Sequence, residues 1–126
     1  PVFYSYLIDY DEKVVGVTLK TFVEALRAEG APFGANWTVP VYWYPPFPKR
    51  NMYPHRKCPF DCEHTKRFID YSRGICPVAE SCYQRTLFFN MQLYDLNNEL
   101  IDQIYRVFEK VYANLSALKD YEKMKM

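Results

Sequence analysis

Proline crowding is the sequence feature that most constrains this chain. Seven of its nine prolines fall between residues 32 and 59. Proline lacks a backbone N–H and fixes φ, so it interrupts helices and central strands. We therefore expect residues 45–75 to form one long loop, and loops of that length are usually functional or disordered. Aromatic side chains in and just before this stretch favour an ordered, functional loop. They are Trp43, Tyr44, Phe47, Tyr53, Phe60, Phe68 and Tyr71.

Regular structure is predicted on both sides of that loop. Residues 2–10 are rich in aromatic and β-branched side chains and predict a strand. Thr18 can cap a helix whose apolar residues recur every three to four positions, and Gly30 ends it. Residues 38–44 predict a second strand, which Pro40 places at a sheet edge or at a strand end.

The C-terminal part predicts two helices and a short extended segment. Pro77 suits the first position of a helix that reaches about Gln84. Residues 86–90 are expected to be extended, and Asp95 is expected to cap the strongest helix, with the last residues frayed. One apolar stripe runs along that helix. It comprises Leu100, Ile104, Val107, Phe108, Val111, Leu115 and Leu118.

This order of elements predicts an α+β fold. We expect a small, mostly antiparallel sheet with helices on one face, plus the long ordered loop rich in aromatic residues and proline. Residues 1–126 are long enough for a single domain. With so few strands, the other face of the sheet needs a partner, and the chain begins with proline rather than methionine. We therefore expect a piece of a longer protein.

Bulk composition excludes several classes. The net charge of +1 argues against strong steering toward nucleic acid or anionic membranes. No apolar run reaches the ~18 residues that a membrane span needs. A hydrophobic fraction of 49% argues against disorder. We therefore expect a globular protein of the cytoplasm.

The near-zero net charge hides an uneven distribution. Residues 49–73 hold seven bases and three acids, which leaves +4 there and −3 in the rest of the chain. Such a loop could bind an anionic group such as a phosphate or a carboxylate. Equally, its cations could be solvated or paired with acids. The candidate anion-binding residues are Arg50, Arg56, Lys57 and Arg67.

Four possible metal ligands lie within ten residues of the same loop. They are His55, Cys58, Cys62 and His64. Their spacing departs from the common C-x2-C knuckle, so zinc is an alternative rather than the main interpretation. Disulfides are less expected still, and free, mostly buried thiols are the default for all four cysteines. Residues 49–73 could also serve a freestanding module that binds zinc, nucleic acid or another protein.

No catalytic set emerges from these residues alone. The four glycines are isolated, so no phosphate-binding glycine loop is present, and both histidines share one loop. Paired acids, such as Asp61 with Glu63, are explained by loop solvation.

Four segments in a fixed order carry a resemblance to a known family. Residues 5–34 read SYLIDYDEKVVGVTLKTFVEALRAEGAPFG, and residues 39–47 read VPVYWYPPF. Residues 76–80 read CPVAE, and the closing helix contains IYRVFEKV at residues 104–111. Together they resemble the C-terminal small domain of fold type I pyridoxal-phosphate aminotransferases, closest to the DegT–StrS sugar and cyclitol aminotransferases.

The resemblance implies the chemistry of the whole enzyme. That family transfers an amino group from glutamate or glutamine to a keto-sugar or keto-cyclitol, through a Schiff base between pyridoxal phosphate and a lysine. The lysine and most cofactor ligands belong to the large domain, which this chain lacks. We therefore expect no catalytic residue and no bound cofactor in this chain alone, and a homodimer for the full enzyme. No nucleic acid or membrane partner is expected.

The resemblance also suggests substrate-binding residues. Tyr42 occupies the position at which many nucleotide-sugar members of the family carry a histidine that faces the substrate. A phenol there can still hydrogen-bond a hydroxyl or a carboxylate, and the departure mildly favours a cyclitol or another small ring. Tyr44, Asn36 and Trp37 are neighbouring candidates, although packing explains each of them equally well.

Overall fold

The computed structural model describes residues 3–53 and 58–125 and separates into two compact units. The first unit contains the described residues up to Trp37 together with those from Gln84 onward, and the second unit is Thr38–Tyr83. In the described part of the chain, no helix is both long enough and apolar enough to cross a lipid bilayer.

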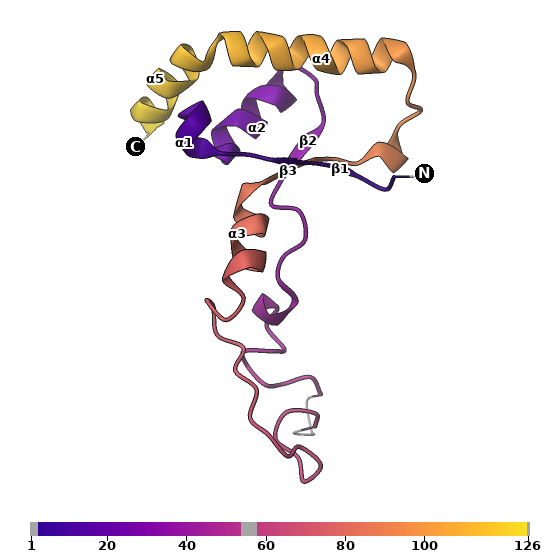
Figure 1. Cartoon of the computed structure of the whole chain (residues 1–126), viewed down its shortest axis with the longest axis vertical. Coiled ribbons are helices and arrows are strands. Elements are labelled where there is room, and N and C mark those ends of the chain that lie inside the picture. Colours follow the sequence, from indigo (N-terminus) through magenta and orange to yellow (C-terminus); the bar gives the residue numbers. More distant parts are fainter. Residues whose placement is uncertain (1–2, 54–57, 126) are drawn as a thin grey trace. The chain divides into compact units, whose positions relative to one another are not determined.

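The first unit is built on a small antiparallel sheet. Its strands are β1 (Tyr6–Asp9), β2 (Phe33–Ala35) and β3 (Thr86–Phe89), in the order β1-β3-β2 (Figure 1). Ile8 and Ala35 flank Leu87 on either side. The predicted α+β class is confirmed, as are the strands expected near the N-terminus and in residues 86–90.

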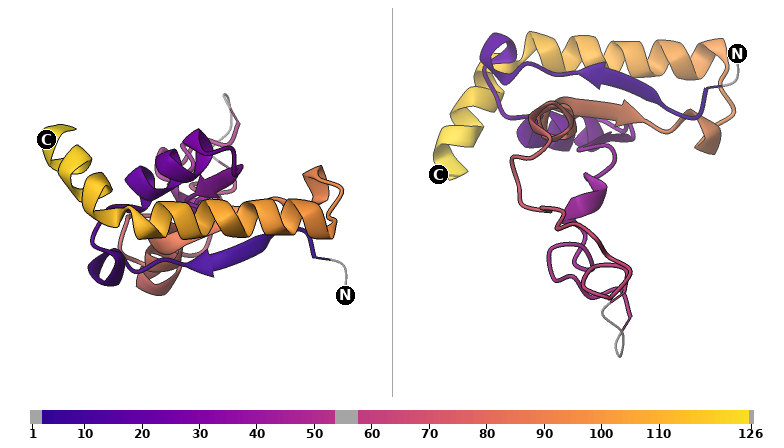
Figure 2. Two further views of the ribbon diagram at one scale, coloured as in Figure 1. Left: turned by 90° about the horizontal axis from the view of Figure 1, so that it is seen from above. Right: turned by 60° about the horizontal axis from the view of Figure 1, so that its bottom comes forward.

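Two helices cover one face of this sheet. Both α2 (Leu19–Ala28) and α4 (Asn98–Ala113) lie on the same side of it (Figure 2). Because strand side chains alternate between faces, Leu87 and Phe89 point into the core while Phe88 points away from it. Leu26 of α2 is fully buried there, and burial of such a side chain stabilises a fold by about 1.5–3 kcal/mol.

Capping residues set the positions at which the first two helices begin. The Thr18 side chain accepts a hydrogen bond from the backbone N–H of Thr21, so the predicted cap of α2 is confirmed. A short helix that the sequence did not predict, α1 (Glu12–Val15), precedes it. Asp11 caps α1 and Gly16, with φ of 82°, ends it.

The end of the chain differs from prediction. The cap of α4 is Asn97 rather than Asp95, because the Asn97 side chain accepts the N–H of Leu100. The helix stops at Asn114, whose side-chain amide donates to the carbonyl of Lys110 at 2.8 Å. A separate helix, α5 (Leu115–Lys125), follows, so the frayed end expected for these residues is wrong.

The prediction of a second strand at residues 38–44 is also wrong. Residues 41–43 form a 3-10 helix (Val41–Trp43), in which Trp43 N–H donates to the carbonyl of Pro40. Pro40 cannot donate to a sheet, and local i to i+3 bonds satisfy the following backbone instead. The strand that pairs with β3 on the side opposite β1 is β2, which comes earlier in the chain than residues 38–44.

The second unit is mostly irregular, as its prolines predict. It holds the 3-10 helix and the beginning of α3 (Pro77–Arg85), which opens at the predicted proline. The described residues between 45 and 75 form turns, bends and irregular segments, with an isolated bridge residue at Tyr53. Phe47, Phe60 and Tyr71 pack their rings together with centroids 5.4–6.1 Å apart, and Phe60 is buried. These rings give the loop a small apolar core of its own.

Candidate functional site

The second unit brings two distant sequence segments together at Tyr42. This residue lies in the 3-10 helix, and its hydroxyl donates a hydrogen bond to the Glu80 carboxylate in the first turn of α3. The same Glu80 oxygen accepts the backbone N–H of Gly74 at 2.6 Å. The phenol and the turn before α3 are therefore tied to one carboxylate.

The protonation states of this pair follow from their contact. Partial burial, followed by the hydrogen bond to Glu80, raises the pKa of Tyr42 to about 12. The hydrogen bond from Tyr42 is the main cause that lowers the pKa of Glu80, and Gly74 N–H and the charge of Arg73 act in the same direction. At neutral pH the phenol keeps its proton and directs it to an ionised Glu80. The phenol oxygen can then accept a hydrogen bond from a hydroxyl or ammonium group.

Two aromatic side chains and an arginine, namely Trp43, Tyr83 and Arg73, lie near the Tyr42–Glu80 pair. The Trp43 ring packs edge-on against Tyr83, with centroids 5.4 Å apart, and the Arg73 guanidinium lies 4.2 Å from its centroid. Such cation–π contacts hold an arginine head group over an indole face. Within the described residues, the buried indole N–H of Trp43 has no hydrogen-bond partner. Tyr44, another predicted site residue, is half exposed at the end of the 3-10 helix.

The other two predicted substrate residues belong to the first unit. The backbone N–H of Asn36 donates to the carbonyl of Thr86 at 2.9 Å, and its φ is 61°. The Trp37 ring packs on Phe88 at 4.7 Å and on Tyr4 at 5.9 Å, on the side of the sheet away from α2 and α4. Trp37 thus covers that face of the sheet and Asn36 continues the pairing with β3, whereas Tyr42 and Tyr44 lie in the second unit.

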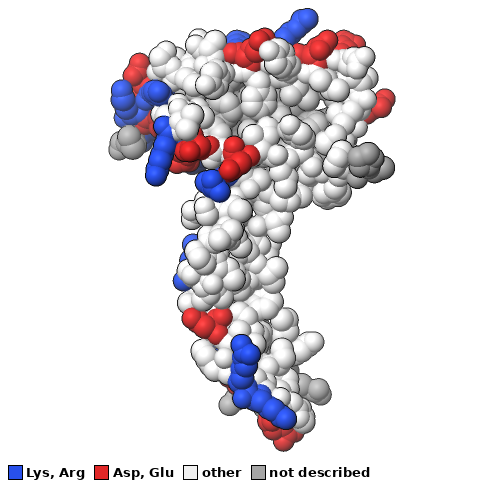
Figure 3. Space-filling view, viewed as in Figure 1, with Lys and Arg blue, Asp and Glu red and all other residues white. Residues whose placement is uncertain are grey.

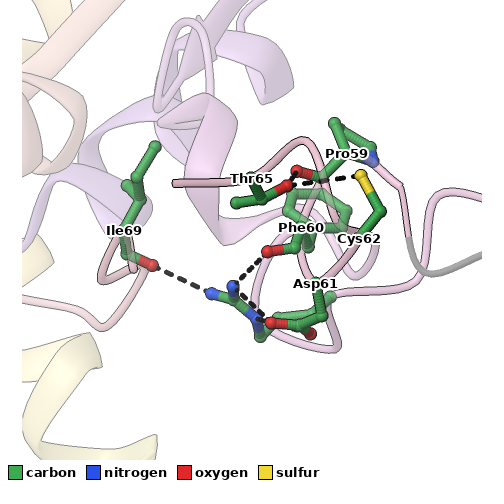
Figure 4. A network of polar contacts seen from close by, with 7 residues as sticks. Pro59, Phe60, Asp61, Cys62, Thr65 and Ile69 are labelled. Atoms are coloured by element: carbon green, nitrogen blue, oxygen red, sulfur yellow. Dashed lines mark hydrogen bonds and ion pairs between the residues drawn. The ribbon is translucent and has the colours of Figure 1, made fainter. Parts of the chain in front are cut away.

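Arg50 binds three other residues of the basic loop, which comprises residues 49–73. Its guanidinium donates to the Asp61 carboxylate at 2.9 Å and to the carbonyls of Phe60 and Ile69 at 2.8 and 3.0 Å (Figure 4). It also lies 4.5 Å from the centroid of Phe68. Because an arginine fork satisfied by a carboxylate is already paired, an external anion would have to displace Asp61. The structure therefore gives Arg50 a role in holding the loop together.

Of the three remaining candidate anion-binding residues, Arg67 lies within the part of the chain that the structure describes. Arg67 is exposed and lines a hollow on the loop, which is taken up below. Arg56 and Lys57 lie outside the described residues. On the face drawn in Figure 3, basic atoms at the loop end of the second unit lie beside acidic atoms.

The cysteines do not follow the predicted pattern of free, buried thiols. Cys58 and Cys62 form a disulfide, while Cys76 and Cys82 are exposed and lie outside it. Both sulfurs of the disulfide are therefore unavailable as thiolate ligands for zinc in this state. His64 is exposed beside Glu63, with 3.4 Å between Nε2 and Oε1, and His55 lies outside the described residues. Among the described residues, no group of three or more potential metal ligands is found.

Sequence reasoning missed the partners of its own candidates. It singled out Tyr42 but not Glu80, which lies 38 residues later in the chain. The one available signal was the CPVAE segment, which ends in that glutamate. It likewise listed Arg50 as a candidate anion-binding residue and left pairing with acids open, without identifying Asp61 of the same loop as the partner.

Comparison of the chain with protein-family models, with curated proteins and with solved structures finds no match to any of them.

Proposed function

We propose that this chain is the C-terminal small domain of a pyridoxal-phosphate aminotransferase of the DegT–StrS type. The full enzyme would transfer an amino group from glutamate or glutamine to a keto-sugar or keto-cyclitol, as a cytoplasmic homodimer. The single observation that carries the proposal is the contact between Tyr42 and Glu80. It joins two of the four segments that resemble the family, which are separate in sequence and adjacent in space.

The chemistry of this contact suits substrate binding. With its proton held by Glu80, the Tyr42 oxygen presents an acceptor to a ring hydroxyl or to the amine of a donor. A fixed acceptor of this kind orients a polyhydroxylated ring more strictly than a freely rotating phenol does. Tyr42 is thus proposed as a substrate-binding residue and Glu80 as the residue that positions it.

We assign the lysine that binds the cofactor to the large domain rather than to this chain. Every described lysine is exposed to solvent, and several pair with surface acids, such as Lys110 with Glu29. A lysine that forms a Schiff base is instead shielded, because desolvation lowers its pKa. We therefore assign pyridoxal phosphate, which supplies the electron withdrawal needed for amino transfer, to the missing large domain.

The proposal is tested first in the full enzyme. Tyr42→Phe should lower kcat/KM roughly tenfold, the effect of one lost hydrogen bond to bound substrate. Tyr53→Phe is the matched control, because Tyr53 is exposed and lies in the same unit. Near-native, equal kinetics for both variants would reject the role of Tyr42.

A second test needs only the reading frame and the chain itself. The residues encoded before Pro1 should contain a large domain with a lysine in a Schiff-base context. The isolated chain mixed with pyridoxal phosphate should show no stoichiometric aldimine absorbance. A specific aldimine on this chain would contradict the assignment of the cofactor to the large domain.

The alternative of a freestanding zinc module has its own test. It needs Cys58 and Cys62 as thiolates, so the chain must be reduced before zinc is added. Elemental analysis that finds one zinc per reduced chain would support this module against the aminotransferase domain.

A further inference from the structure

A hollow on the loop of the second unit has the composition of an anion site. Its volume is about 450 Å³, within the range of small-molecule pockets. Lys66, Arg67 and His64 line it, together with the Cys58–Cys62 disulfide and Ile69. Of the described residues that line this hollow, none is acidic.

The three acids of the loop each contact another residue, and for Asp61 and Asp70 that residue lies outside the hollow. Asp61 is held by the Arg50 guanidinium, as Figure 4 shows. Asp70 accepts the backbone N–H and the hydroxyl of Ser72, both at 2.8 Å, and these bonds lower its pKa. Glu63 lies beside the imidazole of His64. Among the described residues, no carboxylate of residues 58–73 forms an ion pair with Lys66 or Arg67.

The two cations at the hollow are exposed side chains outside the ion pairs of the loop. Within the described part of the chain, neither Lys66 nor Arg67 has an ion-pair partner, and both are exposed. The planar guanidinium of an arginine offers paired hydrogen-bond donors, and the ammonium of a neighbouring lysine adds a point charge on a flexible side chain. Two positive charges match a dianion, whereas a single carboxylate would leave one of them unpaired.

The walls of the hollow are held in place. The disulfide closes one side, and the Thr65 hydroxyl, which donates to the carbonyl of Pro59 at 2.6 Å, also lies 3.4 Å from Cys62 Sγ (Figure 4). The Arg50 network fixes the chain at Phe60 and Ile69. The backbone around Lys66 and Arg67 is thus braced at both ends, which reduces the ordering cost of binding.

We propose that this hollow binds the dianionic phosphate group of a small phosphate ester, with Lys66 and Arg67 as its main ligands. The site stands on the second unit alone, so it is independent of the proposed amino transfer. If that function holds, the phosphate would belong to a substrate or cosubstrate of the enzyme.

The test is a titration of the isotope-labelled chain with inorganic phosphate, followed by NMR at constant ionic strength. Constant ionic strength matters because surface attractions are screened by salt. Saturable shifts centred on residues 62–69 are expected, with acetate binding roughly tenfold more weakly because it leaves one cation unpaired.

Variants then assign the ligands. Lys66→Gln and Arg67→Gln should each weaken phosphate binding roughly tenfold, the effect of one lost charge-assisted hydrogen bond. Lys49→Gln is the matched control, since Lys49 is exposed on the same loop outside the hollow. Arg67→Lys keeps the charge and should recover part of the loss.

Three results would overturn the proposal. These are shifts that never saturate, equal weakening by Lys49→Gln, and tighter binding of a single-stranded oligonucleotide with steep salt dependence, which would indicate a nucleic-acid surface. Because the titration uses neither pyridoxal phosphate nor amino transfer, its failure would leave the proposed function untouched.

Discussion

Gly34 leaves room for an aromatic ring on the open face of the sheet. A Cβ built at this position would lie 2.2 Å from Cζ of Phe88, its neighbour across the strand pair. Its backbone is not in the left-handed region, so the requirement is for space rather than for conformation. Phe88 in turn packs against Trp37, which limits where the ring could go.

Gly34→Ala is therefore expected to destabilise the first unit. The added methyl group must displace a packed ring, at a cost of about 1–3 kcal/mol. The measurement is the free energy of unfolding in urea, for Gly34→Ala, Phe88→Leu and the double variant. The smaller side chain should relieve the clash, so the double variant should be more stable than the sum of the single effects. Strict additivity would contradict the proposed clash.

At the scale of single residues, the sequence identified candidate site residues but not the residues that they contact. Tyr42 and Arg50 were both selected from the sequence, yet the first is tied to Glu80 and the second to Asp61. Hydrogen-bond partners depend on how the loop folds back on itself. No pattern within a short window contains that information.

Helix α5 is held to the beginning of α2 by one carboxylate. Glu122 Oε1 accepts the backbone N–H of Thr18 at 3.1 Å, the Thr21 hydroxyl at 2.6 Å and the Thr18 hydroxyl. A carboxylate at a helix N-terminus satisfies free N–H groups and interacts favourably with the helix dipole. The hydrogen bonds from Thr18 and then Thr21 lower the pKa of Glu122 below its ordinary value of 4.5.

This contact predicts an acid-sensitive component of stability. A carboxylate whose pKa is lower in the folded chain stabilises it fully above about pH 4.5, and the contribution is lost as the pH falls through the folded value. Glu122→Gln should lower the free energy of unfolding at pH 7 by about 1 kcal/mol, since the group is partly exposed. The difference from the unmodified chain should shrink toward pH 3.

The control for this experiment is Asp102→Asn, an exposed acid on α4. It should leave the pH dependence close to that of the unmodified chain. An equal loss of acid sensitivity in both variants would show that general charge, rather than the Glu122 cap, is responsible.

At the scale of helices and strands, the sequence predicted correctly the starts of α2 and α3, which depend on residues within one turn. The Thr18 cap and the proline at the start of α3 were read correctly because both act within one helical turn. Strand β2 was missed because Phe33–Ala35 is short and contains a glycine, and it is extended only through its pairing with β3. Residues 39–44 have strand-forming side chains, yet the flanking prolines leave their backbone to local bonds.

At the scale of the whole chain, the two units differ in what stabilises them. The first has a contiguous apolar core between the sheet and its helices. The second relies on three aromatic rings, the Arg50 network and the Cys58–Cys62 disulfide. Because the disulfide joins cysteines only four positions apart, its expected contribution through loop closure is about 2 kcal/mol.

Reduction should accordingly loosen one unit and not the other. In a Cys76→Ser/Cys82→Ser background, a reductant can act only on the Cys58–Cys62 disulfide. Amide hydrogen exchange in residues 58–73 should then accelerate, while exchange in α2 and β3 stays unchanged. Faster exchange throughout both units on reduction would mean that they unfold together.

The pairing of β2 with β3 has one more consequence. Ala35 pairs with Leu87, and these strands immediately flank the segment that holds the second unit (Figure 1). The whole segment is therefore an insertion into a β-hairpin, with its entry and exit on neighbouring strands. Insertions at such points can lengthen, shorten or diversify without shifting strand register. Evolution could thus vary the residues around Tyr42 and the phosphate hollow while the scaffold that carries them stays constant.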